Sequence, residues 1–328
     1  MKKNIALLAG GFTGESVVSY NSAKQIESQL DIDLFNVYKI IVTKEEWYYL
    51  DHQNQKHQIN KNDFSIVLEG VKITFEAVFI IIHGSPGEDG KFQSYFDLLN
   101  IPYTTCDATT SAITMNKAYT KAIVNGITDL HIAKSKQLFA FNTSNEKEIA
   151  AELKLPLFIK PNNGGSSIGM SKVNDWESLN DALKKAFAED HQILVEEFIG
   201  GREFTVGIYQ QNGEVIVLPI TEIISSKEFF DFEAKYTTGA SEEITPALLP
   251  MNITQKVGEI VKSVYAKLNC KGVVRVDFIL EESTQNFYFI EINTVPGQSE
   301  NSIIPQQVRA AGMQMKYFYT LLIEEALA

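Results

Sequence analysis

The fold class is decided by the stretch AVFIIIHGSPGEDG, which occupies residues 77–90. Its first six residues are all apolar, and a short apolar run followed by turn residues is typical of a strand buried on both faces of a sheet. The loop that follows is polar, begins at His83 and contains Glu88. Because open α/β sheets bind ligands where their strands end, this loop predicts a ligand site. Taken alone, His83 is more typical of a structural histidine with satisfied hydrogen bonds.

The segments before this stretch alternate between strand-like and helix-like patterns. Such alternation predicts an α/β unit built on an open parallel sheet. The loop that follows the first strand lacks a GxGxxG motif, so NAD binding is not predicted. The expected elements are strands over residues 4–9, 36–42, 47–50 and 71–75 and a helix over residues 15–30.

Beyond residue 105 the pattern changes to single helices between pairs of strands. The Gly200-Gly201 pair marks a further break. We therefore expect three units, 1–105, 106–200 and 201–328. The expected helices cover residues 111–125, 176–189, 253–269 and 313–328, and the expected strands cover 157–160, 170–173, 193–198, 203–209, 215–220, 273–280 and 287–292.

Composition excludes several classes of protein. The formal net charge of -12 disfavours nucleic acid and anionic membranes as partners, since phosphate-rich surfaces require a basic footprint. Cys106 and Cys270 form no CxxC or Cys/His cluster, so neither a disulfide scaffold nor a zinc site is expected, and a reducing cytoplasm fits. The sequence has no apolar stretch as long as a membrane span, and the short apolar start is better explained as a strand than as a signal peptide.

A loop rich in glycine and serine, residues 160–169, lies between two predicted strands. It begins with Lys160 and contains Ser166 and Ser167. Exposed backbone N–H groups beside a lysine form a cradle for anions, which makes phosphate binding one interpretation. A flexible hairpin loop is the other, and the Walker sequence is missing.

The next segment, residues 196–203, runs from Glu196 through a strand end to Glu203. An exposed strand end offers backbone groups to the edge of an adenine, and a carboxylate a few residues later can hold ribose hydroxyls. An ordinary strand and turn with solvated charges explains the same pattern.

Charged residues alternate on a predicted strand pair near the C-terminus. Alternation places Arg275 with Asp277 on one face and Glu291 with Asn293 on one face. Two carboxylates and an amide oxygen suit Mg²⁺ completed by phosphate oxygens. The alternative is a surface salt bridge between Arg275 and Asp277. The turn that follows, residues 294–302, offers N–H groups and hydroxyls to a carboxylate or an oxyanion.

Taken together and in this order, these segments resemble the D-alanine–D-alanine ligase family of the ATP-grasp superfamily over the whole chain. No single motif is decisive, but the ordered set is specific. It comprises residues 10–19, 83–90, 101–104, 115–117, 160–169, 196–203, 233–236, 275–277 and 291–297, and Ser302.

The resemblance implies an ATP-grasp fold: an N-terminal open parallel α/β sheet domain and two α+β domains that enclose ATP. Phosphates would be bound by Lys117, Lys160, Ser167 and, from a mobile loop of about residues 225–240, Lys235. Adenine would be framed by Glu196, Glu197, Phe198 and Ile199, and ribose by Glu203. Asp277, Glu291 and Asn293 would hold two Mg²⁺ ions, with Mn²⁺ as a substitute.

The implied reaction joins two D-alanine molecules through an acylphosphate for peptidoglycan precursor synthesis. By resemblance the enzyme is a cytoplasmic homodimer. The implied catalytic residues are Glu15 for the first ammonium, Arg275 and the Gly297 N–H for the oxyanion, Ser302 for the second carboxylate, and Ser166 and Tyr236 linked to Glu15. His83 and Glu88 belong to the substrate loop.

Three residues depart from the family pattern: Asn116 replaces an aspartate, and Thr105 and Ser94 replace glycines. None is an implied catalytic group, so they put only local geometry in doubt. One alternative is another ATP-grasp ligase with a different acceptor, such as D-lactate; Tyr236 argues against D-lactate because such relatives tend to lack it. A nucleotide-binding protein without catalysis is the other alternative.

Overall fold

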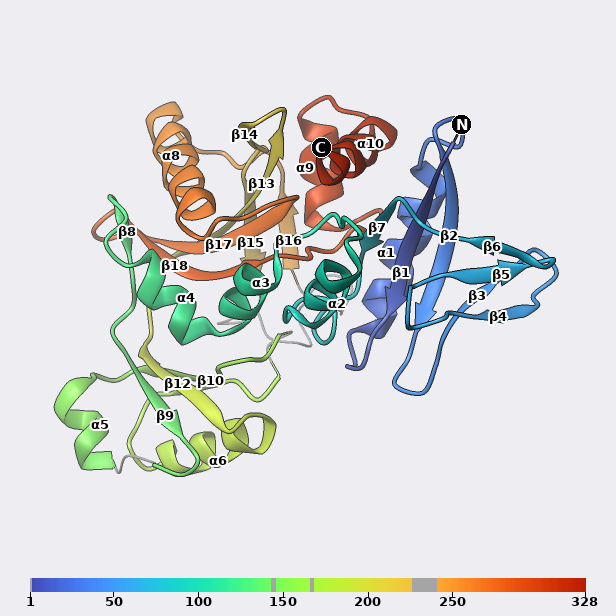
Figure 1. Cartoon of the computed structure of the whole chain (residues 1–328). Helices are drawn as coiled ribbons and strands as arrows, with labels where there is room; N and C mark the ends of the chain where they lie inside the picture. The colour runs from blue at the N-terminus through green and yellow to red at the C-terminus, as the bar shows by residue number, and fades with distance from the viewer. Residues whose placement is uncertain (1, 143–145, 166–167, 226–240) are drawn as a thin grey trace.

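The chain is described by a computed structural model at residues 2–142, 146–165, 168–225 and 241–328. Figure 1 shows a sheet unit at the N-terminus, a small sheet unit in the middle of the chain, and a large sheet formed mainly by the C-terminal part. Within these ranges, no helix has both the length and the apolar character needed to cross a membrane.

The N-terminal sheet has strand order β4-β3-β2-β1-β7. Three neighbouring strands are parallel, as predicted, because β1 pairs in parallel with both β2 and β7. Strands β3 and β4 extend the sheet beyond β2 in antiparallel fashion. The strands are β1 (Lys3–Gly10), β2 (Phe35–Val42), β3 (Trp47–Leu50), β4 (Lys56–Gln58) and β7 (Ala77–Ile80), and β5 (Ile66–Leu68) and β6 (Val71–Ile73) form a separate ribbon.

Helices α1 (Ser16–Gln29) and α2 (Lys91–Leu99) belong to this unit, and α2 was not predicted. One face of the sheet shares a core with α10 (Met315–Leu327), the last helix of the chain, through Phe79, Phe318 and Tyr319. The other face packs on Phe64, whose ring contacts that of Phe96 of α2 edge to face, with the ring centroids 4.8 Å apart. The C-terminal helix therefore belongs physically to the N-terminal sheet.

The helix predicted over residues 111–125 is in fact two helices, α3 (Ala108–Met115) and α4 (Lys117–Val124). The break falls at Asn116, whose backbone is extended and whose side chain accepts a hydrogen bond from the Tyr119 N–H at 3.0 Å. Asparagine and aspartate are both strong N-cap residues, so the departure from the family aspartate preserves the cap. The break makes Lys117 the first residue of α4, and its backbone N–H donates to the Asn162 carbonyl.

The middle unit is a four-stranded antiparallel sheet of order β11-β10-β12-β9. Its core unites Ile159, Leu183 and Val195, and α6 covers one face. The strands β10, β11 and β12 and the helix α6 were predicted, whereas β9 and α5 were not. The elements are β9 (Ser135–Phe139), β10 (Leu157–Pro161), β11 (Ser171–Val173), β12 (Gln192–Glu197), α5 (Glu146–Glu152) and α6 (Leu179–Glu189).

The third sheet is the largest, with strand order β16-β15-β13-β17-β18-β8 and β14 paired to β13. The hairpin between β13 and β14 turns at Asn212 and Gly213, which both have positive φ, as a tight hairpin turn requires. Helix α8 packs on this sheet. Strand β8 precedes the middle unit in the sequence, and it pairs in parallel with β18 at the edge of the sheet. The elements are β8 (Leu130–His131), β13 (Arg202–Gln211), β14 (Glu214–Val217), β15 (Thr221–Ser225), β16 (Ser241–Ile244), β17 (Val274–Glu281), β18 (Asn286–Asn293), α8 (Met251–Lys267) and α9 (Ile303–Ala310).

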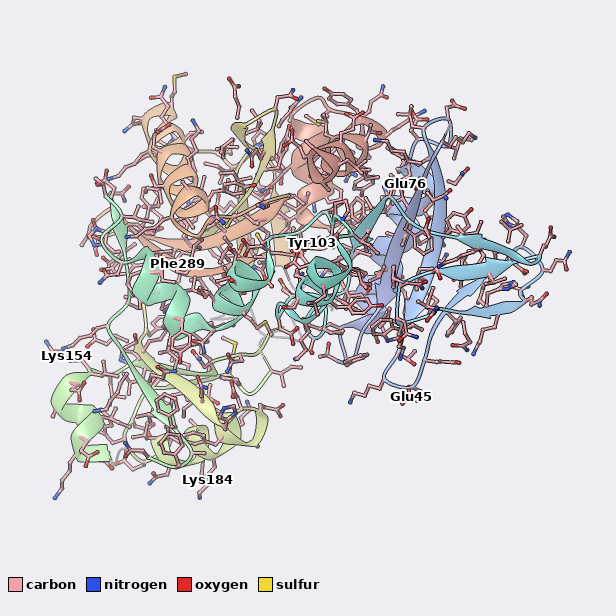
Figure 2. The ribbon with its side chains drawn as sticks, viewed as in Figure 1. Glu45, Glu76, Tyr103, Lys154, Lys184 and Phe289 are labelled. Carbon is pink, nitrogen blue, oxygen red and sulfur yellow. The ribbon has the colours of Figure 1, made fainter. Side chains whose placement is uncertain are left out.

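Figure 2 shows Phe289 on the large sheet and Lys184 on the side of the middle unit that faces away from the large sheet. Residues 108–131 precede the middle sheet in the sequence, yet their helices and β8 adjoin the large sheet. The unit boundaries near residues 105 and 200 stay predictions.

The N-terminal unit and the large sheet meet at a close backbone contact. Gly272 has φ +61, and a Cβ there would lie 2.0 Å from the Thr104 carbonyl oxygen. Next to it, the Lys271 N–H donates to the Cys106 sulfur at 3.4 Å. Cys270, distant from Cys106 in the sequence, is buried in the same core, and both thiols are free. The Cys106 thiol and burial together raise the pKa of Cys270.

This contact predicts a large difference between two glycine substitutions. Gly272→Ala should lower the free energy of unfolding by about 2–4 kcal/mol, because it combines a clash with a left-handed backbone. Gly258→Ala is the matched control: Gly258 lies inside α8 with no atom within 4 Å of an added Cβ. Alanine there should stabilise the chain by about 0.5–1 kcal/mol. Thermal unfolding of both variants measures the difference, and equal midpoints would refute the close contact.

Candidate active site

Two adjoining cavities lie between the three sheets. The first is bounded by the middle sheet and the large sheet, and encloses about 1050 Å³ of space including its open mouth. The second is bounded by the N-terminal unit, the large sheet and the start of α9, and encloses about 1710 Å³, again including its open mouth. Both are large enough for a small-molecule ligand. The residues that line both cavities are Lys117, Gly164, Gly165, Glu203, Asp277 and Glu291.

A buried charge cluster forms one wall of the first cavity. The carboxylate of Glu196 pairs with Lys160 through one oxygen, at 2.5 Å, and with Lys121 through the other. All three side chains are at least nine-tenths buried. Burial alone would raise the pKa of Glu196, but the two ammonium groups lower it to about 2. Burial lowers the pKa of Lys121 to about 8 against the attraction of Glu196.

The end of β12 provides a flat edge at this cavity. The N–H groups of Glu197 and Phe198 are engaged, donating to the carbonyls of Lys134 and Pro156 at 2.9 Å each. The Ile199 N–H donates to no residue in the described part of the chain, and Ile199 lines the cavity. The Ile199 N–H is therefore available to donate a hydrogen bond to a ligand in the cavity. Glu203, at the start of β13, lines the same cavity.

Lys117 connects the glycine loop with the large sheet. Its ammonium donates to the Gly164 carbonyl at 2.5 Å and lies 3.2 Å from the Glu291 carboxylate. Its position follows from the break at Asn116, which starts α4 at the point where the two cavities meet. Lys117 therefore places a positive charge on the shared wall.

The strand pair β17–β18 brings the predicted alternating residues face to face. Arg275 lies opposite Asn293, and Asp277 lies opposite Glu291. The guanidinium of Arg275 donates two hydrogen bonds to Asp277, at 2.9 and 2.8 Å. Thr205 and Asn293 also donate to this carboxylate, at 2.5 and 3.0 Å. The alternative interpretation predicted a surface salt bridge. The ion pair between Arg275 and Asp277 forms, but it is not on the surface, because Asp277 is only 6% exposed and both residues line the second cavity.

The donor set of this strand pair fits a hard cation. Carboxylate and amide oxygens are the ligands that Mg²⁺ takes, and it usually takes few of them and fills its shell with phosphate and water. Across the described ranges, no three side chains of His, Cys, Asp or Glu are grouped closely enough to hold a metal ion by themselves. Asp277 and Glu291 with the Asn293 amide would therefore supply only part of the ligand shell of such a cation, and phosphate or water would supply the rest.

The second cavity receives residues from all three units. Glu15, at the N-cap of α1, lines it together with His83, Glu88 and Arg275. An added Cβ at Gly84 would lie 2.7 Å from one oxygen of Glu15, and at Gly165 2.9 Å from the other. The Glu15 carboxylate thus lies between the loop after β7 and the glycine loop of the middle unit.

His83 is buried and Glu88 is partly buried, and the surroundings shift the pKa of both side chains. Glu88 accepts hydrogen bonds from the N–H groups of Gly84, Thr294 and Val295. Burial nevertheless raises the pKa of Glu88 to about 7, and the nearby Glu15 adds to the rise. Burial lowers the pKa of His83 to about 4. The expectation of a fully satisfied histidine is wrong, since His83 Nε2 has no hydrogen-bond partner among the described residues.

The turn after β18 lines the second cavity with Gly297 and ends at Ser302, the N-cap of α9. The Ser302 hydroxyl makes no capping hydrogen bond and instead lies 2.7 Å from the Ser299 hydroxyl. A helix N-terminus with hydroxyls is a favourable place for an anion. Ser166, Ser167, Lys235 and Tyr236, which were also predicted for the site, lie outside the described residues.

Two residues of the site were missed in the sequence. Lys121 lies four residues after Lys117, so both project from one face of α4, and that spacing is a signal. Thr205 contacts Asp277 across β13 and β17, which no local pattern indicates.

Two sheets of antiparallel strands that enclose a cavity lined by lysines and carboxylates define the ATP-grasp fold. A family model described as the N-terminus of D-ala D-ala ligase matches residues 4–106, and one described as its C-terminus matches residues 127–324. The chain belongs to the D-alanine–D-alanine ligase family.

Relatives of known name match over nearly their whole length. The D-alanine–D-alanine ligase of Parabacteroides distasonis is 42% identical over 100% of this chain and 98% of its own. That of Flavobacterium johnsoniae is also 42% identical, over 99% of this chain and 100% of its own.

Solved structures agree with the fold. The D-Ala:D-Ser ligase VanG from Enterococcus faecalis superposes with a TM-score of 0.87 at 30% identity, covering 99% of this chain and 100% of its own. The D-alanine–D-alanine ligase of Bacillus anthracis complexed with ATP superposes with a TM-score of 0.77 at 25% identity, covering 99% of this chain and 97% of its own.

Proposed function

We propose that this enzyme joins two D-alanine molecules into D-alanyl-D-alanine, with ATP converted to ADP and phosphate. The observation that carries the proposal is the wall shared by the two cavities, which holds Lys117, Asp277 and Glu291. A phosphoryl group that passes from a nucleotide in the first cavity to a carboxylate in the second must cross this wall. Its mixture of ammonium and carboxylate groups suits such a transfer.

In the first step a carboxylate oxygen of one D-alanine attacks the γ-phosphorus of ATP, and the bond to the β–γ bridging oxygen breaks. The products are ADP and D-alanyl phosphate. Lys117 and Lys160 neutralise the phosphate charge, while the Ile199 N–H and the Glu196 carboxylate hold the adenine edge. Glu203 holds the ribose hydroxyls. Glu15, which lies between two glycine loops, binds the ammonium of this first D-alanine.

In the second step the amine of the other D-alanine attacks the acyl carbon, and phosphate leaves as the peptide bond forms. Arg275 and the Gly297 N–H stabilise the negative charge that develops on the carbonyl oxygen. Ser302 at the start of α9 binds the second carboxylate. The attacking ammonium must first lose a proton, and Glu88, with its pKa raised to about 7, is able to accept it near neutral pH.

Mg²⁺ would be held by Asp277, Glu291 and Asn293, where it would offset phosphate charge during the transfer. Two ions are proposed from the resemblance to the family, and the register that places Glu291 opposite Asp277 brings both carboxylates to one place. Mn²⁺ has similar oxygen preferences and should substitute.

Incubation with Mg²⁺, ATP and D-alanine tests the activity. ADP, phosphate and D-alanyl-D-alanine should appear in equal amounts, and all three should be absent when L-alanine replaces D-alanine. A coupled phosphate assay and chromatography of the dipeptide measure them. Phosphate release stimulated by a different amino acid, with no response to D-alanine, would refute the substrate assignment.

The acceptor is the second question, because the solved relative VanG is a D-Ala:D-Ser ligase. Mixed D-alanine, D-serine and D-lactate in the same assay separates these acceptors by the products formed. Tyr236, which favours an amine acceptor by resemblance, lies outside the described residues. We propose D-alanine because the named relatives at about 40% identity are D-alanine–D-alanine ligases.

We also infer a cytoplasmic homodimer that acts in peptidoglycan precursor synthesis. The two buried free thiols are consistent with a reducing compartment. Light scattering in solution tests the dimer.

A further inference from the structure

We infer that Lys121 is a positioning residue for base recognition, which holds Glu196 ionised and oriented so that the cavity selects a purine with an exocyclic 6-amino group. The inference rests on the proposed function only in placing a nucleotide in the first cavity. It assigns a role to Lys121, which is not one of the lysines proposed to bind the phosphates.

The first observation is the excess of positive charge in the cluster. One carboxylate, Glu196, is shared by two lysines, Lys160 and Lys121, and each lysine pairs with a different oxygen. A purely structural buried ion pair would be neutral, since an uncompensated buried charge is costly. One of the two ammonium groups is therefore surplus to the carboxylate and available to an anionic ligand.

The second observation is the position of each lysine. Lys160 lies near the end of β10, and the glycine loop with Gly164 and Gly165 follows it within the same cavity wall. Lys121 instead lies in the last turn of α4, and it is 4% exposed. When Lys160 turns toward a phosphate, Lys121 remains as the partner that compensates Glu196.

The third observation is the neighbourhood of the carboxylate. Glu196 lines the cavity beside Phe198 and Ile199, where the backbone edge is exposed to a ligand. An ionised carboxylate accepts a hydrogen bond from an amino group but repels a carbonyl oxygen. A buried carboxylate without a cationic partner tends to take up a proton, and would then lose this selectivity. By keeping Glu196 ionised, Lys121 thus maintains the preference for a base with an amino group.

Calorimetry with ADP and with IDP, whose base carries a 6-oxo group, tests the inference. Neither measurement needs D-alanine, so failure of the ligase assignment leaves the test intact. The unmodified enzyme should prefer ADP. Lys121→Met should reduce the ratio of the two affinities by roughly ten- to hundredfold, the effect of one charge-assisted hydrogen bond. Lys184→Met, which changes a lysine whose side chain is 79% exposed, should leave the ratio unchanged.

A double-mutant cycle separates positioning from general stability. Glu196→Gln should lose the preference by itself, and adding Lys121→Met should reduce it no further. Lys121→Gln, which keeps a hydrogen-bond donor, replaces the apolar variant if thermal unfolding shows that the latter is not folded. An unchanged affinity ratio, or an equal loss of ADP and IDP binding in a folded variant, would overturn the inference.

Discussion

Replacing Glu291 with glutamine should lower turnover by about a thousandfold or more, while the chain still folds. The substitution keeps the shape of the side chain and removes one negative charge from the wall shared by both cavities. It weakens the pair with Lys117, whose ammonium lies 3.2 Å from the carboxylate, and removes a carboxylate oxygen that we propose as a Mg²⁺ ligand. Phosphate release at saturating ATP and D-alanine, measured over a series of Mg²⁺ concentrations, gives the loss.

A control separates this effect from a general change of charge. Glu282→Gln alters an exposed carboxylate in the turn between β17 and β18 and should leave turnover unchanged. A second readout is ADP affinity with and without Mg²⁺, which should lose its metal dependence only in the Glu291 variant. Full activity of Glu291→Gln at saturating Mg²⁺ would remove this residue from the metal ligands.

Local patterns predicted most of the elements because their causes are local. The apolar runs of β1 and β7 and the Asn212-Gly213 turn specify strands and a hairpin without reference to the rest of the chain. The helix break at Asn116 was missed for the opposite reason. Its N-cap lies inside a continuous helix-like pattern, so only the geometry of the chain distinguishes a cap from an ordinary helical residue.

Which sheet an element joins was beyond the sequence. Helix α10 is the last helix of the chain, yet its Phe318 and Tyr319 share a core with the N-terminal strands. Strand β8 is two residues long and pairs with β18, although the whole middle unit separates them in the chain. Long-range packing decides both placements, and periodicity carries no information about the partner.

The site divides in the same way. Arg275, Asp277, Glu291 and Asn293 were grouped correctly because a strand pair fixes its register and brings alternating side chains together. Lys121 was not recognised because a lysine in a helix is ordinarily solvated. Its partner, Glu196, lies 75 residues away, and burial becomes evident only after the middle sheet meets α4. The raised pKa of Glu88 has the same origin in tertiary burial.

Replacing Arg275 with methionine should lower kcat by about a hundred- to a thousandfold, the effect of removing one group that stabilises an oxyanion. Arg275 lines the second cavity beside Gly297, and its guanidinium is fixed by two hydrogen bonds to Asp277. Burial alone would lower the pKa of Arg275, but the Asp277 carboxylate raises it above the ordinary value, so the charge is permanent across the working pH range. Steady-state kinetics in D-alanine measure kcat and KM separately.

A second variant is needed to separate the loss of stability from the loss of kcat, because Arg275→Met also leaves Asp277 without its main partner. The hydrogen bonds from Thr205 and Asn293 remain, so a loss of about 2–4 kcal/mol in stability is expected for Arg275→Met. Arg275→Lys keeps the positive charge but cannot form the bidentate pair, and should recover most of the stability with only part of kcat. If the unfolding midpoint and kcat both fell in Arg275→Met and both recovered fully in Arg275→Lys, the role of Arg275 would be to support the fold of the strand pair and not to stabilise the oxyanion.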